Sequence, residues 1–181
     1  NVSPLQLNRM GFAEQFLERA LPWASPEFGL DVEITEGALL DESAAVFDQL
    51  RMLRAAGINV AIDDFGTGFS SLARLDRLPI DTLKIDRSFI SRLAAGGRGR
   101  KLVSVIIAIA RAFRMTVIAE GVETQEQLQT LGQLGCDQSQ GYLHSRPVPG
   151  AAFAQLLRKN AGEAGAAGVA PVGGARRRAT H

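Results

Sequence analysis

Residues 59–68 read Asn-Val-Ala-Ile-Asp-Asp-Phe-Gly-Thr-Gly, and this stretch decides the fold. A short apolar run at residues 59–63 passes directly into two acids and a glycine-rich turn. Similar short runs recur along the chain, at residues 30–35, 82–85, 116–119 and 139–143. Because segments with helical periodicity separate these runs, the pattern predicts repeated βα units and a parallel sheet covered by helices.

Helical patterns occupy the segments between the runs, at residues 3–21, 43–56, 98–114, 124–135 and 149–159. The segment 98–114 has apolar side chains at helical spacing, and Thr124 with Gln127 resembles a capping box. The chain therefore contains about five βα units plus an initial helix. A (β/α)₈ barrel typically needs about 250 residues. We expect an α/β fold that is an incomplete TIM-like barrel, with its first strands absent.

The chain is expected to comprise one domain, residues 1–159, and a tail, residues 160–181. The tail is rich in Ala, Gly and Arg and shows no apolar periodicity, so we predict that it is disordered. The first residue is Asn, within what looks like the end of a strand, and we interpret the chain as a fragment of a longer protein.

Composition excludes several classes of protein. The net charge is +1, so no broad basic face is expected, and we predict no DNA or RNA partner. Cys136 is the single cysteine, which rules out an internal disulfide and fits a cytoplasmic location. The most apolar stretch, residues 102–113, is far short of the ~20 residues that span a bilayer. Segments outside the chain could still tether the parent protein.

Polar side chains gather where the predicted strands end: Asn1, Glu33, Glu36, Asp63, Asp64, Lys84, Asp86, Glu120, Glu123 and Gln140. Clustered carboxylates repel one another unless a cation neutralises them. Oxygen ligands favour Mg²⁺, Mn²⁺ or Ca²⁺, and two histidines are too few for an imidazole-rich zinc site. Lys84 lies in an apolar strand, where an unpaired cation is costly, so it must pair with acids. Together these residues predict an oxygen-ligand metal site beside a lysine.

Each residue also has a structural explanation. Glu33 and Glu36 can be solvated loop acids, and the Asp63–Asp64 pair can belong to a tight turn. Glu120 and Glu123 can favour a helix N-terminus, Gln140 can cap a backbone group, and an inert salt bridge would satisfy Lys84. The regular βα spacing of the whole set favours the metal site over these separate explanations.

Six motifs of this chain, in order, resemble the EAL domain family: Asn-Val-Ser-Pro at 1–4, Glu-Ile-Thr-Glu at 33–36, Asp-Asp-Phe-Gly-Thr-Gly at 63–68, Leu-Lys-Ile-Asp-Arg-Ser-Phe at 83–89, Ala-Glu-Gly-Val-Glu-Thr at 119–124 and Gln-Gly-Tyr-Leu-His-Ser-Arg-Pro at 140–147. Members of this family are bacterial phosphodiesterases that hydrolyse cyclic di-GMP to the linear dinucleotide. The resemblance covers residues 1 to about 158.

The resemblance implies a role for each polar residue. It implies Mg²⁺ or Mn²⁺ as cofactor, with metal ligands at Asn1, Glu33, Asp63, Asp64 and Glu123. It implies that Glu120 is the general base and that Lys84 lies beside the attacking water and the phosphate.

Three further residues match positions at the substrate or at a mobile loop. Asp86 resembles a position that can reach a guanine edge. Gln140 resembles a position near a second metal ion or the bound substrate. Glu36 is similar to the glutamate that anchors the loop at residues 65–71. That loop implies a homodimer contact, and relatives often carry N-terminal regulatory domains.

One departure from the family keeps alternatives open. The Glu-Ala-Leu segment that names the family, whose glutamate is a metal ligand, does not occur in these 181 residues. The parent protein is expected to be an active phosphodiesterase, and the chain alone weakly active or inactive. A catalytically inactive cyclic di-GMP receptor and an interaction scaffold are the alternatives.

Overall fold

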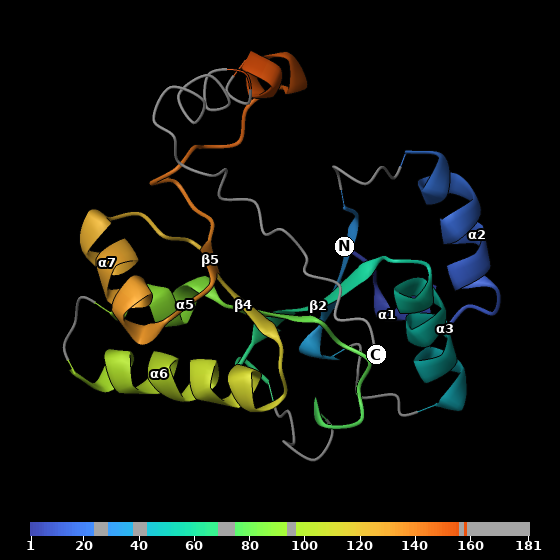
Figure 1. Cartoon of the computed structure of the whole chain (residues 1–181), viewed down its shortest axis with the longest axis horizontal. Helices are drawn as coiled ribbons and strands as arrows, with labels where there is room; N and C mark the ends of the chain where they lie inside the picture. The colour runs from blue at the N-terminus through green and yellow to red at the C-terminus, as the bar shows by residue number, and fades with distance from the viewer. Residues whose placement is uncertain (24–28, 38–42, 69–74, 94–96, 156–157, 159–181) are drawn as a thin grey trace. The chain divides into compact units, whose positions relative to one another are not determined.

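The computed structural model describes residues 1–23, 29–37, 43–68, 75–93, 97–155 and 158 (Figure 1). The chain forms two compact units, Asn1–His144 and Ser145–His181. The elements of the first unit are α1 (Pro4–Leu7), α2 (Phe12–Ala20), η1 (Leu21–Trp23), β1 (Asp31–Thr35), α3 (Ala44–Ala55), β2 (Asn59–Phe65), β3 (Thr82–Ile85), α5 (Arg87–Ile90), α6 (Gly97–Ala112), β4 (Thr116–Ala119), α7 (Gln125–Leu134) and β5 (Gln138–Ser139). In the second unit, residues 150–155 are helical. None of the described helices is long and apolar enough to cross a membrane.

The strands form one parallel sheet in the order β1-β2-β3-β4-β5, which confirms the predicted α/β architecture. Beside β1, Val2 pairs in parallel with Ile34 through a single bridge, so the first residues of the chain continue the sheet at this edge. All carboxyl ends of the strands therefore lie at one edge of the sheet, where the predicted site residues follow them.

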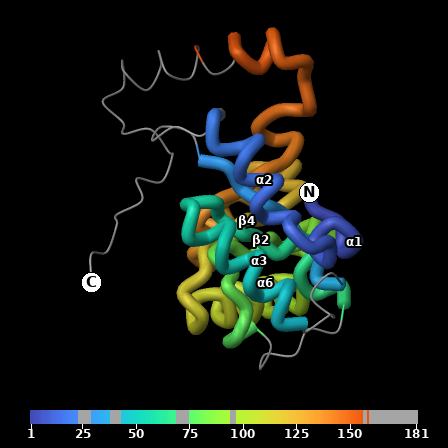
Figure 2. The backbone as a smooth tube through the Cα atoms, turned by 90° about the vertical axis from the view of Figure 1, so that its right-hand side faces the viewer, coloured from blue at the N-terminus to red at the C-terminus, as the bar shows by residue number. Residues whose placement is uncertain are grey.

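The two faces of the sheet differ because side chains alternate along each strand. One face carries apolar side chains that are almost fully buried, among them Ile34, Ile62, Leu83 and Val117. The helices cover this face: α3 contacts β2, and α6 contacts both β3 and β4 (Figure 1). Figure 2 views the unit from the side of α2 and α3. The opposite face carries Glu33 of β1, Asp63 of β2 and Lys84 of β3.

The expected helix at residues 3–21 is wrong in one respect, because the chain breaks it into α1 and α2. Gly11 has φ +74°, a left-handed conformation that glycine adopts without steric cost, and it forms the N-cap of α2. The break frees backbone groups near both helices, and the buried side chain of Gln49 binds two of them. Its Oε1 accepts from Ala13 N at 3.1 Å, and its Nε2 donates to Leu7 O at 2.5 Å.

Two of the strands also differ from the sequence prediction. The strand expected at residues 139–143 is reduced to Gln138–Ser139, followed by a turn. A side chain at Gly141 would place its Cβ 2.2 Å from Val122 O, so the chain turns where only glycine allows this approach. The strand expected at 59–63 extends to Phe65, with a register irregularity between Ile62 and Phe65. The predicted tail at 160–181 lies outside the described residues.

Gln49 provides a test of the α1–α2 junction. Replacing Gln49 by Leu leaves two backbone groups without partners, and we expect the free energy of unfolding to fall by about 2–4 kcal/mol. Urea denaturation followed by circular dichroism measures this loss. The exposed Gln129 of α7 is the matched control, and Gln129→Leu is expected to change stability by less than about 0.5 kcal/mol. Equal effects of the two substitutions would contradict a bridging role for Gln49.

Candidate functional site

A buried lysine lies at the centre of the polar face of the sheet. In β3, Leu83 and Ile85 point into the core, so Lys84 between them points to the other face, where it is only 3% exposed. Its Nζ lies 2.6 Å from Glu33 Oε1, 2.6 Å from Glu120 Oε1 and 3.0 Å from Asp63 Oδ1. These acids come from β1, β2 and the residue after β4, so three strands converge on one cation.

The electrostatics of Lys84 keep it charged. Burial on its own lowers the pKa of the Lys84 ammonium, because a low dielectric disfavours the charged form. The hydrogen bonds with Glu120, Glu33 and Asp63 act in the opposite direction and outweigh burial, so the pKa of Lys84 is raised. The lysine is therefore a fixed positive charge at neutral pH.

Glu120 lies in a different environment from an ordinary surface acid. Burial is the largest influence and raises the pKa of the Glu120 carboxyl, partly offset by the hydrogen bond with Lys84. Gln140 Nε2 donates to Glu120 Oε1 at 2.5 Å. The Gln140 backbone is itself held between β4 and its following loop, because Gln140 N donates to Ala119 O and Gln140 O accepts from Val122 N. The position of Glu120 is thus defined by a cation on one side and an amide on the other.

Two consecutive acids reach the site from the end of β2. Strand residues next to each other normally point to opposite faces, but Asp64 has φ +55° and lies at the register irregularity of β2. Partial burial, followed by the charges of Asp63 and Asp86, raises the pKa of the Asp64 carboxyl, while Lys84 opposes this. Carboxylate oxygens of Asp63, Asp64 and Glu120 all lie within 4.8 Å of one another.

These carboxylates fit a divalent cation with oxygen ligands. Mg²⁺ and Mn²⁺ prefer such hard donors, and three acids whose oxygens lie within 4.8 Å of one another supply them. Asp63 Oδ1 is buried, and its partner within the described residues is the Lys84 ammonium, 3.0 Å away. A carboxylate oxygen has more than one lone pair, so Asp63 can accept from Lys84 and still bind a metal ion.

The glycine-rich turn after β2 is tied to β1 through Glu36. The buried Glu36 side chain accepts hydrogen bonds through Oε2 from Gly66 N at 3.1 Å and from Gly68 N at 3.2 Å. A Cβ at Gly68 would lie 2.8 Å from Glu36 Oε1, so the close approach requires glycine there. Residues 69–71 of the predicted loop lie outside the described residues.

The remaining predicted residues lie around this cluster rather than within it. Asp86 is the N-cap of α5, and its hydrogen bond with Ser88 lowers the pKa of its carboxyl. Asn1 is exposed at the edge of the sheet, next to the bridge between Val2 and β1. Glu123 is half exposed and forms an ion pair of 2.6 Å with Arg87, and the group of acids with oxygens within 4.8 Å of one another consists of Asp63, Asp64 and Glu120.

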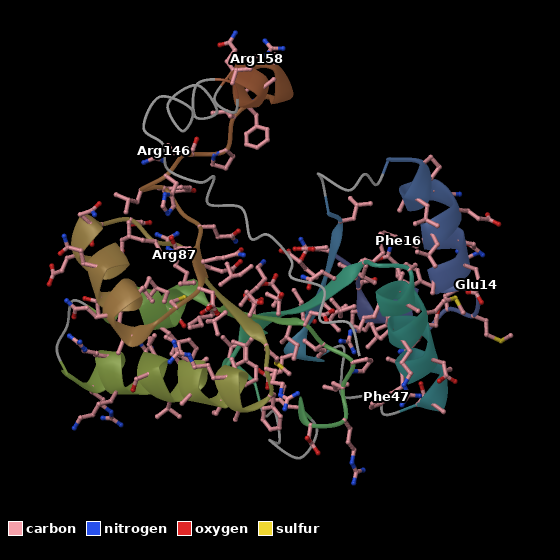
Figure 3. All side chains as sticks on the ribbon, in the orientation of Figure 1. Glu14, Phe16, Phe47, Arg87, Arg146 and Arg158 are labelled. Carbon is pink, nitrogen blue, oxygen red and sulfur yellow. The ribbon has the colours of Figure 1, made fainter. Side chains whose placement is uncertain are left out.

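Arg87, which Figure 3 labels, is the residue that sequence reasoning missed. Its side chain covers Gly121, where a Cβ would lie 2.4 Å from Arg87 Cγ and where φ is +67°. The arginine therefore packs on the loop between Glu120 and Glu123. Arg87 lies within the motif Leu-Lys-Ile-Asp-Arg-Ser-Phe at residues 83–89, and this position could have identified it as a candidate site residue.

Comparisons with known proteins agree with this geometry. The profile of the EAL domain family matches residues 1–147. The cyclic di-GMP phosphodiesterase NbdA of Pseudomonas aeruginosa is 48% identical over 129 residues, which cover 71% of this chain and 16% of NbdA. The EAL domain of Mycobacterium smegmatis DcpA superposes with a TM-score of 0.81 at 42% identity, covering 88% of this chain and 71% of that chain. The phosphodiesterase PaMucR, solved as a c-di-GMP complex, gives a TM-score of 0.77 at 40% identity, covering 84% of this chain and 62% of that chain.

The chain belongs to the EAL domain family. Its parallel sheet and outer helices correspond to part of the TIM-like barrel of that family. The aligned residues span about one sixth of the length of NbdA.

Lys84 offers a direct test of the charge balance. In Lys84→Met the acids around it lose their cation, and we expect the free energy of unfolding at pH 7.5 to fall by about 3–5 kcal/mol. The repulsion raises the carboxyl pKa values of the folded variant, so protonation relieves it and the loss becomes smaller as the pH is lowered toward 5. Thermal denaturation at both pH values measures this. Added Mg²⁺ should restore part of the stability at pH 7.5.

The control for this substitution is Lys101→Met, which changes an exposed lysine of α6 and is expected to have little effect at either pH. A loss of stability in Lys84→Met that is independent of pH would show that packing, rather than charge, is responsible.

A double-mutant cycle tests whether Arg87 and Glu123 form an ordinary surface ion pair. Their side chains are 61% and 41% exposed, and solvent-exposed pairs contribute about 0.2–1 kcal/mol. We expect the coupling energy between Arg87→Ala and Glu123→Ala to lie in this range and to decrease in 0.5 M NaCl. A coupling energy above about 2 kcal/mol would assign the pair a larger structural role.

Proposed function

We propose that this chain carries the catalytic site of a metal-dependent phosphodiesterase that hydrolyses cyclic di-GMP to the linear dinucleotide. The observation that carries the proposal is the buried Lys84 among Glu33, Asp63 and Glu120, with Asp64 beside them. The similarity to NbdA, a cyclic di-GMP phosphodiesterase, and to PaMucR in its c-di-GMP complex supports the choice of substrate.

In this proposal Mg²⁺ or Mn²⁺ is held by the carboxylates of Asp63, Asp64 and Glu33, with Asn1 as a further oxygen donor and Glu123 in an outer position. The bound cation supplies neutralisation of the anionic phosphodiester and a lowered pKa for water. The donors are all oxygen atoms, which is the chemistry that these ions prefer.

The residues of the chain have distinct tasks in the proposed reaction. Glu120 takes the proton of the attacking water, and Gln140 holds the Glu120 carboxylate in place through its hydrogen bond. Lys84 offsets the negative charge that develops on the phosphate as the bond to the leaving oxygen breaks. Its ammonium is already positioned by strands on both sides, so little reorganisation is needed.

Two residues are assigned to the substrate and to the loop. Asp86, at the start of α5, is proposed to accept hydrogen bonds from a guanine edge. Glu36 is proposed to hold the turn that begins at Gly66 in the form that completes the metal site. A homodimer contact through residues 65–71, regulatory domains on the N-terminal side and a cytoplasmic location remain part of the proposal.

The test is hydrolysis of cyclic di-GMP by the parent protein that contains this chain, with Mg²⁺ or Mn²⁺, followed by chromatography of the nucleotides. Glu120→Gln keeps the shape of the side chain and removes the base, so we expect kcat to fall about 10²–10⁴-fold. The matched control is Glu126→Gln, an exposed acid in the first turn of α7, which is expected to retain wild-type activity. EDTA should abolish turnover in all three proteins.

Two outcomes would contradict the proposal. Undiminished hydrolysis in Glu120→Gln would remove Glu120 from the mechanism. Tight binding of cyclic di-GMP without turnover in the wild-type protein would indicate a receptor instead of an enzyme.

A further inference from the structure

The segment that forms α5 and α6 has a charge distribution unlike the rest of the chain. Residues 87–119 contain six arginines and one lysine and no acidic residue. The other 148 residues contain all 19 acids and 13 of the 20 basic residues. The balanced net charge, from which no broad basic face was expected, therefore conceals a strongly cationic segment.

Four of these cations gather around the beginning of α6: Arg92, Arg98, Arg100 and Lys101, all of them exposed. Arg92 precedes the helix, but a Cβ at Gly99 would lie 2.3 Å from Arg92 O and 3.2 Å from Arg92 Cβ, so it packs directly on the first turn of α6. Arg100 donates to Gln133 of α7. Within the described part of the chain, no carboxylate forms an ion pair with any of the four.

This arrangement is unfavourable for the helix itself. The N-terminus of a helix carries a partial positive charge, so acidic residues stabilise the first turn and cations destabilise it. The first turn of α6 has no acidic residue, and two arginines and a lysine occupy its beginning. Folding alone does not account for four cations at this place, whereas an anionic partner would compensate for them.

Exposed aliphatic side chains lie next to the cations. Leu102 and Val105 are 40% and 53% exposed, although most large apolar residues of α6 are buried against the sheet. Leu102 follows Arg98 by four residues and Val105 follows Lys101 by four, which places these side chains on the same side of the helix. Arg100 lies on the flank toward α7, where it donates to Gln133. In Figure 1 α6 lies at the outside of the sheet. We call the four cations together with Leu102 and Val105 the cationic face.

The residues of the cationic face indicate which kind of partner it can bind. A symmetric contact with a second copy would bring the same cations together, which opposes association through this face. Binding sites for proteins usually present an aromatic anchor, and the only aromatic residues of the segment, Phe89 and Phe113, pack partly buried against the core. Four cations within ten residues beside exposed aliphatic side chains are instead typical of segments that bind anionic lipids.

We propose that the cationic face binds the anionic surface of a membrane, with Leu102 and Val105 contacting the boundary between headgroups and acyl chains. This role is independent of the phosphodiesterase activity proposed above.

The experiment measures sedimentation of the chain with vesicles of phosphatidylcholine containing 30% phosphatidylglycerol, and with vesicles of phosphatidylcholine alone. We expect binding to the anionic vesicles only, and its loss in 0.5 M NaCl. The triple substitution Arg98→Gln, Arg100→Gln and Lys101→Gln should weaken binding about 100-fold, because each cation near the surface contributes roughly fivefold. Far-ultraviolet circular dichroism checks that the variants are folded.

The matched control replaces three exposed arginines outside the face, Arg9→Gln, Arg19→Gln and Arg51→Gln, and changes the net charge by the same amount. It should bind within about threefold of the wild type. Equal weakening of vesicle binding in both triple variants would show that net charge alone drives the binding. Full binding by the first triple variant would show that another segment of the chain binds the vesicles. Binding to neutral vesicles, or binding to polyglutamate or duplex DNA but not to anionic vesicles, would also overturn the proposal. None of these outcomes bears on the hydrolysis of cyclic di-GMP.

Discussion

The burial of one lysine is the constraint on which the site depends. An ammonium group loses most of its hydration when it is enclosed by protein, and the cost is recovered only if carboxylates surround it at short distance. Lys84 meets this condition through acids that belong to three different strands. Charge balance at Lys84 therefore requires the correct register of β1, β2, β3 and β4, because a shift by one residue would turn these acids to the other face.

The two faces of the sheet have different roles, because one face forms the hydrophobic core and the other carries the charged residues of the site. Apolar residues of the strands pack against α3 and α6 and supply the hydrophobic core, while the residues between them remain free to carry charge. Carboxylates that repel one another would destabilise an isolated strand or helix. The packing of the opposite face holds them together, so the cost of a charged site is compensated by burial elsewhere in the same strands.

Glycines position the loops that follow the strands. Gly121 leaves room for the side chain of Arg87, and Gly141 allows its segment to approach the Val122 backbone. These contacts hold the loops that carry Glu120 and Gln140 next to each other, and the hydrogen bond between the two side chains follows. Glu120 and Gln140 are thus oriented by contacts at two glycines, Gly121 and Gly141, which have no side chain that could take part in the reaction.

The sequence by itself determined the order of strands and helices and the set of polar residues at the strand ends. Apolar periodicity and strand-end position depend only on neighbouring residues, so the parallel sheet and residues such as Lys84 and Glu120 could be predicted. It did not determine that Gly11 interrupts the first helix or that Glu123 pairs with Arg87, since both depend on contacts between segments distant in the sequence. The contacts at Lys84 and the exposure of the cations at the beginning of α6 depend on the tertiary structure, because distances and exposure arise only when the strands align and the helices pack.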